Sequence, residues 1–320
     1  MIGAGKIAGI KDSPDGDKSV VYTHAKAIYL HHDFELRGLH DIDRSKAKAM
    51  AGIWSVPLVA DSVGDLLDKT KPELVVICSN TDHHYSHLKQ TILSPFRPRI
   101  VFVEKPVCAS LNEFDKLVEL ANQFHVKVLV NHTRRFDPDL AECAQKVRSG
   151  HFGKLINVSA VYYGGWANNG THIMDTIHMF IEPRLEIMDV VEGVSGRHGD
   201  DCLNVKLRVG AAVINIQSFQ EKFYQLFELD FRFRSGRILL RDFGCKLHIE
   251  RPHVNTIGER VLVAENGYPK NALTKPFLNA YELIHRQIID KYKLEQTGAE
   301  LSQTRELMRI IWDCSSRVNN

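Results

Sequence analysis

Short apolar runs alternate with helix-like segments along the first half of the chain. Leu74–Cys78, Ile100–Val103 and Val126–Val130 are dominated by Val, Ile and Leu, and runs of this kind predict buried strands. A further strand is predicted at Phe34–Leu39. Strands that alternate with helices predict an α/β fold with a doubly wound parallel sheet. The predicted helices cover Tyr22–Leu30, 45–53, 110–124 and a segment that ends at Arg148.

The pattern changes after Gly153. Strand-like segments follow one another closely there, separated by turns such as Val209-Gly210 and Ser235-Gly236. This arrangement predicts a mainly antiparallel sheet in an α+β domain, which a helix at 170–180 interrupts. We therefore expect two domains, 1–133 and 134–320, with closing helices at 276–291 and 302–318 as candidates to pack back on the first. The predicted strands are Leu155–Tyr163, Glu186–Val194, Leu203–Val209, Ala212–Phe219, Phe223–Phe233, Arg237–Arg241 and Lys246–Arg251.

The composition is that of an ordinary globular protein, with 320 residues, 44% hydrophobic and 25% charged, and a formal net charge of +2. The balanced charge argues against a nucleic-acid partner, and no apolar run reaches the ~20 residues of a membrane span. Six cysteines are scattered without a CxxC pair, which favours reduced thiols over disulfides or structural zinc. We expect a cytoplasmic protein that acts on a small molecule.

The first nine residues carry a glycine motif of the dinucleotide-binding type. Gly3 would allow a tight turn, Gly5 the close approach of a pyrophosphate, and Ala8 close packing of helix on strand. A strand normally precedes this motif, and only Met1 and Ile2 are available for it. Either that strand is short or the true start lies upstream. Taken alone, the motif is also compatible with a glycine-rich tail.

A loop rich in Pro, Gly and Asp at 11–19 interrupts the place where the first helix should run. Asp41 then follows the strand at Phe34–Leu39, where an acidic residue binds the ribose 2′-hydroxyl of NAD. Its distance from the glycines exceeds the usual ~20 residues, and the loop accounts for the excess. Asp41 favours NAD, while Arg44 keeps NADP as the alternative cofactor. A capping role for Asp41 in the helix at 45–53 is the competing interpretation.

A polar segment with three histidines, Ser79–His87, follows the strand that ends at Cys78. A metal site is one interpretation, but no matching set of ligands lies nearby in the sequence. The order of strand, polar turn and helix favours a loop that lines the cofactor cleft, so we assign no metal ligand. The candidate cofactor contacts in this segment are Ser79, Asn80 and His84.

The apolar run Ile100–Val103 stops at the tripeptide Glu104-Lys105-Pro106. Pro106 cannot donate a hydrogen bond to a sheet, so strand pairing should end there. Lys105 is therefore expected at the carboxyl end of a strand, where open α/β sheets bind ligands. A partly desolvated lysine can exchange a proton near neutral pH, which makes Lys105 a candidate catalytic residue. A solvated lysine at a strand end is the competing interpretation.

Several motifs, taken in order, make the sequence similar to the Gfo/Idh/MocA oxidoreductases, the glucose–fructose oxidoreductase and inositol dehydrogenase family. The resemblance covers nearly the whole chain. It implies an N-terminal Rossmann domain, a C-terminal domain with a large open sheet, and a nicotinamide cofactor. It also implies a homodimer or homotetramer formed through that sheet, and a cis peptide before Pro106. The motifs are Gly3–Ala8, Asp41, Ser79–His84, Glu104–Pro106, Arg135–Pro138, Ser149–Gly153 and Gly170–Asp175.

The resemblance also implies roles for single residues. Lys105 resembles the catalytic lysine that binds the reacting hydroxyl, and His172 resembles the catalytic histidine, with Asp175 three residues on. Inositol dehydrogenases have an aspartate four residues before that histidine, where this chain has Asn168, which cannot take a proton at neutral pH. The further cofactor candidates are Lys6, Ile7 and Glu104. The further substrate candidates are Arg135, Asn168, Asn169 and Trp166, the last by stacking on a sugar face.

These features predict an NAD(P)-dependent dehydrogenase for a secondary alcohol of a sugar or cyclitol. His172 would take the hydroxyl proton while Lys105 stabilises negative charge on oxygen. A non-catalytic, dinucleotide-binding regulator of the same fold is the alternative, favoured by Asn168 and by the loop at 11–19. Trp166 in a core and Arg135 in a salt bridge are competing interpretations. A metal-dependent hydrolase is disfavoured, because His172 and His178 would lie about 120° apart around a helix.

Overall fold

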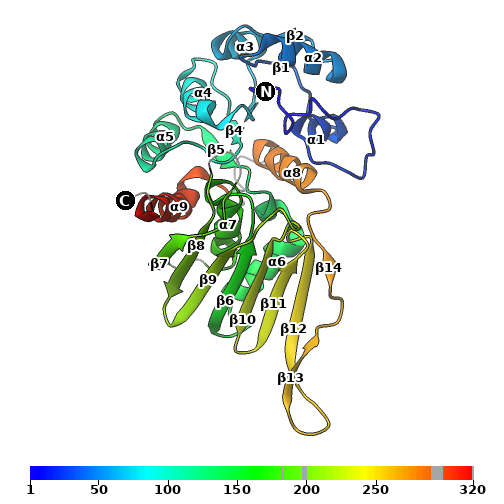
Figure 1. Ribbon diagram of the computed structural model, residues 1–320. Helices are drawn as coiled ribbons and strands as arrows, with labels where there is room; N and C mark the ends of the chain where they lie inside the picture. The colour runs from blue at the N-terminus through cyan, green and yellow to red at the C-terminus, as the bar shows by residue number, and fades with distance from the viewer. Residues whose placement is uncertain (182–183, 197–199, 290–297, 319–320) are drawn as a thin grey trace. The chain divides into compact units, whose positions relative to one another are not determined.

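The computed structural model describes residues 1–181, 184–196, 200–289 and 298–318 (Figure 1). The chain forms two compact units. The first comprises Met1–Phe136 and Thr274–Arg305, and the second comprises Asp137–Leu273 and Glu306–Asn320. The segment from Thr274 thus returns to the first unit after the whole antiparallel sheet has been formed in sequence.

A parallel sheet forms the centre of the first unit. Its strands are β1 (Gly38–Leu39), β2 (Leu58–Val59), β3 (Leu74–Ile77), β4 (Ile100–Val103) and β5 (Lys127–Val130). β1 pairs with β2, β3 with β4, and β4 with β5, all in parallel. Helices connect successive strands, so the predicted doubly wound parallel sheet is confirmed.

Met1 and Ile2 supply the strand that the glycine motif needs. Ile2 bridges in parallel to His40 on one side and to Ile77 on the other, which joins β1 and β2 to the other three strands. The Ile2 N–H donates to Val76 O over 2.8 Å, and Gly3 N–H donates to His40 O over 2.7 Å. The side chain of Ile2 is fully buried. Two residues therefore suffice for a central strand, because both neighbours pair with the same short segment.

The helix after the glycine motif is built from two separate pieces of sequence. Residues 5–9 form one turn, in which Gly9 N–H donates to Gly5 O over 3.2 Å. The chain then leaves this path and rejoins it at α1 (His24–Leu30), where His24 N–H donates to Ile7 O over 3.1 Å. In an uninterrupted helix that carbonyl would accept from residue 11. Segment 11–23 is therefore an insertion within one helix.

Three other helices of the first unit, α2, α3 and α5, begin at capping side chains. Asp43, Ser62 and Ser110 each accept a backbone N–H of the first turn, as N-cap residues do. The last predicted helix of this unit is described to Ile289, and residues 290–291 of that prediction lie outside the described residues. The helices are α2 (Arg44–Trp54), α3 (Val63–Thr70), α4 (Thr81–Leu93), α5 (Leu111–Gln123), η1 (Thr133–Phe136), α8 (Pro276–Ile289) and η3 (Leu301–Thr304).

A large mixed sheet dominates the second unit. Its strands are β6 (Leu155–Tyr162), β7 (Glu186–Glu192), β8 (Leu203–Val209), β9 (Ala212–Ser218), β10 (Glu228–Phe233), β11 (Gly236–Arg241), β12 (Lys246–Val254), β13 (Arg260–Ala264) and β14 (Lys270–Asn271). The strand order is β13-β12-β11-β10-β6-β9-β8-β7, with β14 beside β12. β6 and β9 are parallel and the other described pairs are antiparallel, which confirms the predicted, mainly antiparallel sheet.

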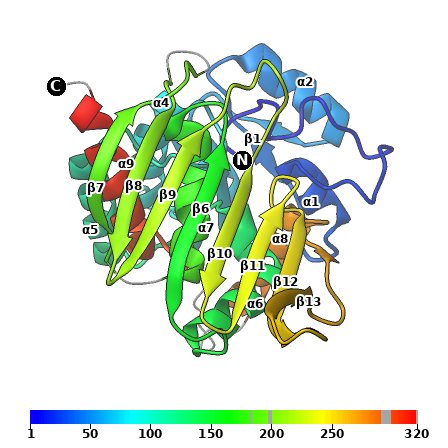
Figure 2. The same ribbon diagram turned by 60° about the horizontal axis from the view of Figure 1, so that its bottom comes forward.

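Helices cover one face of this sheet, as Figure 2 shows with α6 and α7 behind the strands. They are α6 (Pro138–Arg148), the short π-helical turn η2 (Trp166–Gly170), α7 (Thr171–Phe180) and α9 (Arg305–Val318). Along β6, Val158, Ala160 and Tyr162 are buried, whereas the residues between them are half-buried. This period of two is expected for a sheet that packs helices on one face only.

Three predicted strand boundaries were wrong by more than two residues. The strand predicted at Phe34–Leu39 pairs only at Gly38–Leu39, because Phe34 and Leu36 pack against the core rather than continue the ladder. The strand predicted from Phe223 begins at Glu228, and Phe223 is exposed. β12 runs three residues past the predicted end at Arg251, because it forms a hairpin with β13, a short and fully exposed strand that the sequence pattern did not predict.

All six cysteines are free thiols, as predicted, and only Cys245 among them is partly exposed. In the part of the chain that the structure describes, no helix has the length and apolar character needed to cross a membrane.

Candidate functional site

The glycine motif lines a pocket of about 190 Å³ in the first unit. The pocket lies at the carboxyl ends of the parallel strands, where the chain turns from Ile2 into Gly3 and from β3 into α4. Open α/β sheets bind their ligands at this edge. The pocket brings together five of the predicted cofactor residues, Gly3, Gly5, Asp41, Ser79 and Asn80.

The two glycines of the motif do different work. Gly3 has a φ of +103°, and a Cβ built on it would lie 2.4 Å from Ser79 N and 2.5 Å from the carbonyl carbon of Cys78. Only glycine fits this conformation and this approach of two backbones. A Cβ on Gly5 would meet no atom within 4 Å. Gly5 therefore leaves room beside the pocket, while Gly3 closes its wall.

Asp41 closes one side of the pocket. Its Oδ2 accepts Ala4 N–H over 2.7 Å, and its Oδ1 accepts Asp43 N–H over 2.8 Å. The capping role that competed for Asp41 belongs to Asp43, whose carboxylate accepts the N–H groups of Ser45 and Lys46. Asp41 is thus held against the glycine motif, and each oxygen retains acceptor capacity for a ligand hydroxyl.

The cation near this carboxylate differs from the prediction. Arg44 forms an ion pair with Asp61. Lys46 lines the pocket instead, 3.6 Å from Asp43. Lys6 and Ile7 are exposed on the turn that follows the glycines and are not among the pocket residues.

His84 is buried and joins two loops. Its Nε2 lies 2.8 Å from Ser79 O, and its Nδ1 lies 2.7 Å from Pro106 O. Both ring nitrogens are therefore engaged by backbone carbonyl groups. The prediction that His84 contacts the cofactor directly is wrong, because the ring is 2% exposed and binds protein on both sides. It fixes the Ser79 turn of the pocket beside the loop that carries Lys105.

Lys105 follows β4 and is half-buried, and the Lys105–Pro106 peptide is cis as expected. Behind it lies a chain of hydrogen bonds. Glu104 Oε1 lies 3.0 Å from His24 Nε2 and accepts Asn131 Nδ2 over 2.5 Å. His24 Nδ1 lies 3.0 Å from the hydroxyl of Tyr281, which is fully buried on α8. The carboxylate can only accept, so His24 Nε2 donates to Glu104.

The pKa values of this chain of groups follow from burial and pairing. Burial alone would raise the pKa of Glu104, but the hydrogen bond and charge of His24, the Asn131 amide and the charge of Lys105 lower it overall. Burial raises the pKa of Tyr281 well above its ordinary value, so its hydroxyl keeps its proton. Glu104 is therefore an anchored carboxylate next to Lys105. The prediction that it contacts the cofactor stays a prediction.

His172 and Asp175 belong to the second unit and lie on α7, one turn apart. His172 is half-buried, and Asp175 is 2% exposed. Lys105 belongs to the first unit. Their joint catalytic role therefore stays a prediction.

The turn before α7 is held by a residue that the sequence did not single out. Asp200 accepts Ala167 N–H and Asn168 N–H, each over 2.8 Å. Asn168 is exposed and Asn169 is half-buried on this turn. Gly165 makes the approach possible, because a Cβ there, at φ +99°, would lie 2.1 Å from Asp200 Oδ2. A carboxylate thus stands beside the position where inositol dehydrogenases have their aspartate.

The predicted stacking of Trp166 on a sugar face is wrong. The indole is 1% exposed, and its Nε1–H donates to Ile311 O of α9 over 3.0 Å. Its ring packs against Tyr162, and a Cβ at Gly170 would lie 2.5 Å from it. Trp166 is a core residue of the second unit, because the small Gly170 lets the helix turn close over the ring.

Arg135 lies on η1 of the first unit and is buried. Its Nη1 packs closely against Gly298: a Cβ built on that glycine would lie 2.2 Å from Nη1. Its predicted contact with substrate stays a prediction.

Sequence reasoning missed His24, Lys46 and Asp200. For His24 a signal exists, since His24, Ala27 and Ile28 repeat at helical spacing, which would have placed the histidine on the buried face. For Asp200 the partners are more than thirty residues away, and no local pattern joins them.

Comparison with known proteins agrees with this geometry. Residues 1–132 match a family model described as oxidoreductase family, NAD-binding Rossmann fold. The D-glucoside 3-dehydrogenase of Escherichia coli (strain K12) is 26% identical over 160 residues, which cover 50% of this chain and 41% of that protein. In the first two curated relatives the match spans 40% and 52% of their length, so the chain aligns with about half of each.

Two solved structures extend the likeness to both units. KijD10, a 3-ketoreductase from Actinomadura kijaniata in complex with NADP and TDP-benzene, has a TM-score of 0.75 and 13% identity, covering 98% of this chain and 95% of that chain. A super-repressor mutant of Gal80p from Saccharomyces cerevisiae has a TM-score of 0.74 and 14% identity, covering 92% and 91%. At these identities the likeness shows the fold alone.

Proposed function

We propose that this chain is an NAD(P)-dependent dehydrogenase or reductase of the Gfo/Idh/MocA type, because residues 1–132 match the model of that oxidoreductase family's NAD-binding Rossmann fold. Its substrate class is a secondary alcohol or ketone of a sugar, cyclitol or sugar derivative. The observation that carries the proposal is that Gly3, Gly5 and Asp41 line one pocket. His84 contacts both the Ser79 turn of this pocket and the loop that carries Lys105.

The residues of this pocket fit a dinucleotide. The space beside Gly5 admits a pyrophosphate close to the backbone, and Asp41 presents acceptors for ribose hydroxyl groups. When bound, the nicotinamide accepts or supplies the hydride. Asp41 favours NAD, because a fixed carboxylate repels the 2′-phosphate of NADP. Lys46 is the cation that keeps NADP as the alternative.

The proposed chemistry divides between two side chains. Lys105 stabilises negative charge that develops on the substrate oxygen, and His172 takes the hydroxyl proton as general base. Asp175 orients His172 one helical turn away. Glu104, anchored by His24 and Asn131, keeps a negative charge next to Lys105.

The second candidate is a dinucleotide-binding regulator without turnover. Asn168 favours it, because an amide cannot take a proton where inositol dehydrogenases have a carboxylate. Asp200, whose carboxylate binds the Asn168 N–H, favours the enzyme instead, because it returns a carboxylate to this turn. Cofactor binding without turnover on any polyol would select the regulator.

Cofactor choice tests the pocket. We expect NADH to bind more tightly than NADPH. Both affinities are measured by titration with nicotinamide fluorescence as the signal. Asp41→Ala should weaken NADH binding by about tenfold or more, the usual effect of losing hydrogen bonds to a charged group. It should leave NADPH binding unchanged or tighter, because the repelling carboxylate is gone.

The change in the ratio of the two affinities separates this role from a structural one. Damage to the fold would weaken both cofactors alike. Asp68→Ala, at an exposed position of α3 away from the pocket, is the matched control and should change neither affinity. Equal loss of NADH and NADPH in Asp41→Ala would contradict the assignment.

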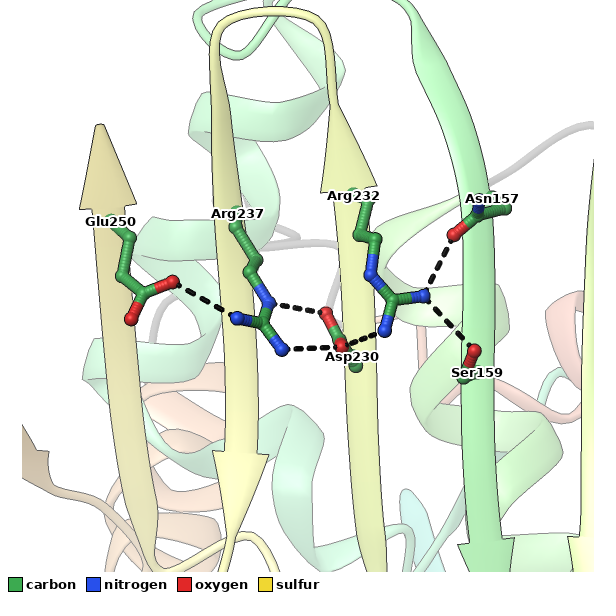
Figure 3. A network of polar contacts seen from close by, with 6 residues as sticks. All are labelled: Asn157, Ser159, Asp230, Arg232, Arg237 and Glu250. Carbon is green, nitrogen blue, oxygen red and sulfur yellow. Dashed lines mark hydrogen bonds and ion pairs between the residues drawn. The ribbon is translucent and has the colours of Figure 1, made fainter. Parts of the chain in front are cut away.

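We also propose that the chain forms a homodimer or homotetramer through the outer face of the large sheet. This face carries an ordered network across β12, β11, β10 and β6 (Figure 3). Arg237 binds Asp230 over 2.7 Å and Glu250 over 3.3 Å. Arg232 binds Asp230, and also Asn157 and Ser159 over 2.9 and 3.0 Å. Because these charges are paired with one another within the sheet, a second sheet could cover them without leaving a buried charge unpartnered.

An exposed residue of this face tests the assembly. Asn215 lies on β9 directly beside Ser159 of β6. Asn215→Glu should shift the protein toward monomer in sedimentation velocity without changing its melting temperature. Asn112→Glu, on the exposed side of α5, is the control that should leave the assembly intact.

The proposed location is the cytoplasm, which suits six free thiols.

A further inference from the structure

Histidine and carboxylate side chains gather where the end of α1 meets α8 in the first unit. His31, His32 and Asp33 each present a ligand atom, and these atoms lie within 4.8 Å of one another. His285 and Glu282 reach the same place from α8. Among the described residues, no other group of three such side chains lies this close together.

The spacing of these atoms suits a small cation. Asp33 Oδ2 lies 2.9 Å from His32 Nε2 and 3.1 Å from His285 Nε2. Two ligands bound tetrahedrally at about 2.0–2.1 Å lie about 3.3 Å from each other. Asp33 Oδ2 therefore lies within one ligand–ligand distance of each ring nitrogen. His285 stands outside the group of three and would have to move toward it to complete the site.

His31 adds an independent indication. Its side chain is fully buried, yet its Nε2 has no hydrogen-bond partner. The nearest carboxylate oxygen, Glu282 Oε2, is 3.7 Å away, beyond hydrogen-bond distance. Buried polar atoms are normally satisfied, so an unpartnered imidazole nitrogen next to a histidine and carboxylate cluster indicates a missing ligand. His31 Nε2 can bind a metal ion once the ring proton has moved to Nδ1. This shift breaks the 3.2 Å hydrogen bond that Asp33 N–H donates to Nδ1.

Access and ligand type narrow the choice of ion. The side chain of His32 is 79% exposed and that of Asp33 is 39% exposed, so an ion can enter from solvent. Imidazole with carboxylate suits Zn²⁺, Ni²⁺ and Cu²⁺, whereas Mg²⁺ and Ca²⁺ prefer oxygen alone.

We propose that His31, His32, Asp33 and His285 bind a divalent transition-metal ion, and that Glu282, 3.7 Å from His31 Nε2, adds negative charge beside the ion. The site is separate from the nucleotide pocket, since none of these residues lines it. The ion would join α1 to α8, the helices that carry His24 and Tyr281. The ion would therefore have a structural role, holding α1 and α8 together, and would take no part in the chemistry.

Metal titration of the full chain tests this site. Protein without a polyhistidine tag, dialysed against a chelator, is titrated with Zn²⁺ in competition with a chromogenic chelator. We expect one tight ion per chain and an increase of melting temperature with Zn²⁺ but not with Mg²⁺. Co²⁺ should give the visible absorption bands of a four-coordinate nitrogen and oxygen site.

Variants locate the ion. His32→Ala and His285→Gln should each weaken Zn²⁺ binding by at least about tenfold and abolish the thermal shift. His32 is exposed, so its removal should not affect folding. His253→Gln, at an exposed histidine of β12, is the matched control and should bind as the wild type does. Weak binding of equal strength in all four proteins would identify a hydrogen-bonded histidine cluster and overturn the proposal, while leaving cofactor binding untouched.

Discussion

Lys105→Ala is expected to lower kcat by about 10²–10³-fold while leaving the affinity for NADH unchanged. Lys105 is half-buried at the end of β4, beside a carboxylate that is anchored on both sides. A cation fixed in this place stabilises charge that develops on the substrate oxygen only as the hydride leaves, so its loss raises the barrier rather than weakens binding. The measurement is initial rates with NAD⁺ and myo-inositol, then with a panel of sugars, alongside NADH fluorescence.

The control for this prediction is Lys116→Ala, which removes an exposed lysine on α5. It should keep the wild-type rate. Retention of full turnover by Lys105→Ala on a substrate that the wild type oxidises would remove Lys105 from the mechanism. His24→Ala gives a graded result under the same assay. It should lower kcat less than Lys105→Ala, because His24 acts only through Glu104.

Gly5→Val is expected to abolish NADH binding, by at least about 100-fold, without changing the melting temperature. A Cβ at Gly5 meets no protein atom within 4 Å, so we expect the valine to enter the space beside the pocket at little cost to folding. Gly3→Ala should behave in the opposite way. Its Cβ would lie 2.4 Å from Ser79 N at φ +103°, so it should destabilise the protein by about 2 kcal/mol or more.

Thermal denaturation and NADH titration together distinguish these two glycines. Gly52→Val is the matched control, because Gly52 also has no neighbour within 4 Å but lies on α2, outside the pocket. It should bind NADH normally. If Gly5→Val bound NADH as tightly as the wild type, the glycine motif would not be the cofactor site.

The sequence predicted the elements whose signal is local. β3, β4 and β5 are short apolar runs, and Asp43 and Ser110 cap helices close to the predicted starts. The helix that Ser62 caps, α3, was not predicted. The sequence could not settle the first strand, because Met1 and Ile2 are too few to show a pattern. Only the two neighbouring strands, paired through His40 and Ile77, reveal that these residues form it.

The errors at the candidate site have a common physical cause. Trp166, placed just before a helix with a histidine, was interpreted as a substrate contact, but Gly170 and Ile311 enclose it in a core. His84 was interpreted as a cofactor contact, but carbonyl groups from two loops occupy both of its nitrogens. In both cases the deciding partners come from other parts of the fold, and periodicity along one segment carries no information about them.

The insertion at 11–23 has a consequence for the history of the chain. Its two ends meet where Ile7 and Ala8 accept the N–H groups of His24 and Ala25, as successive turns of one helix would. Joining Ile10 to His24 would restore an unbroken helix that still delivers His24 to Glu104. The length of this inserted segment can therefore vary without disturbing the nucleotide pocket. The number of residues between the glycines and Asp41 therefore includes the inserted segment as well as the motif.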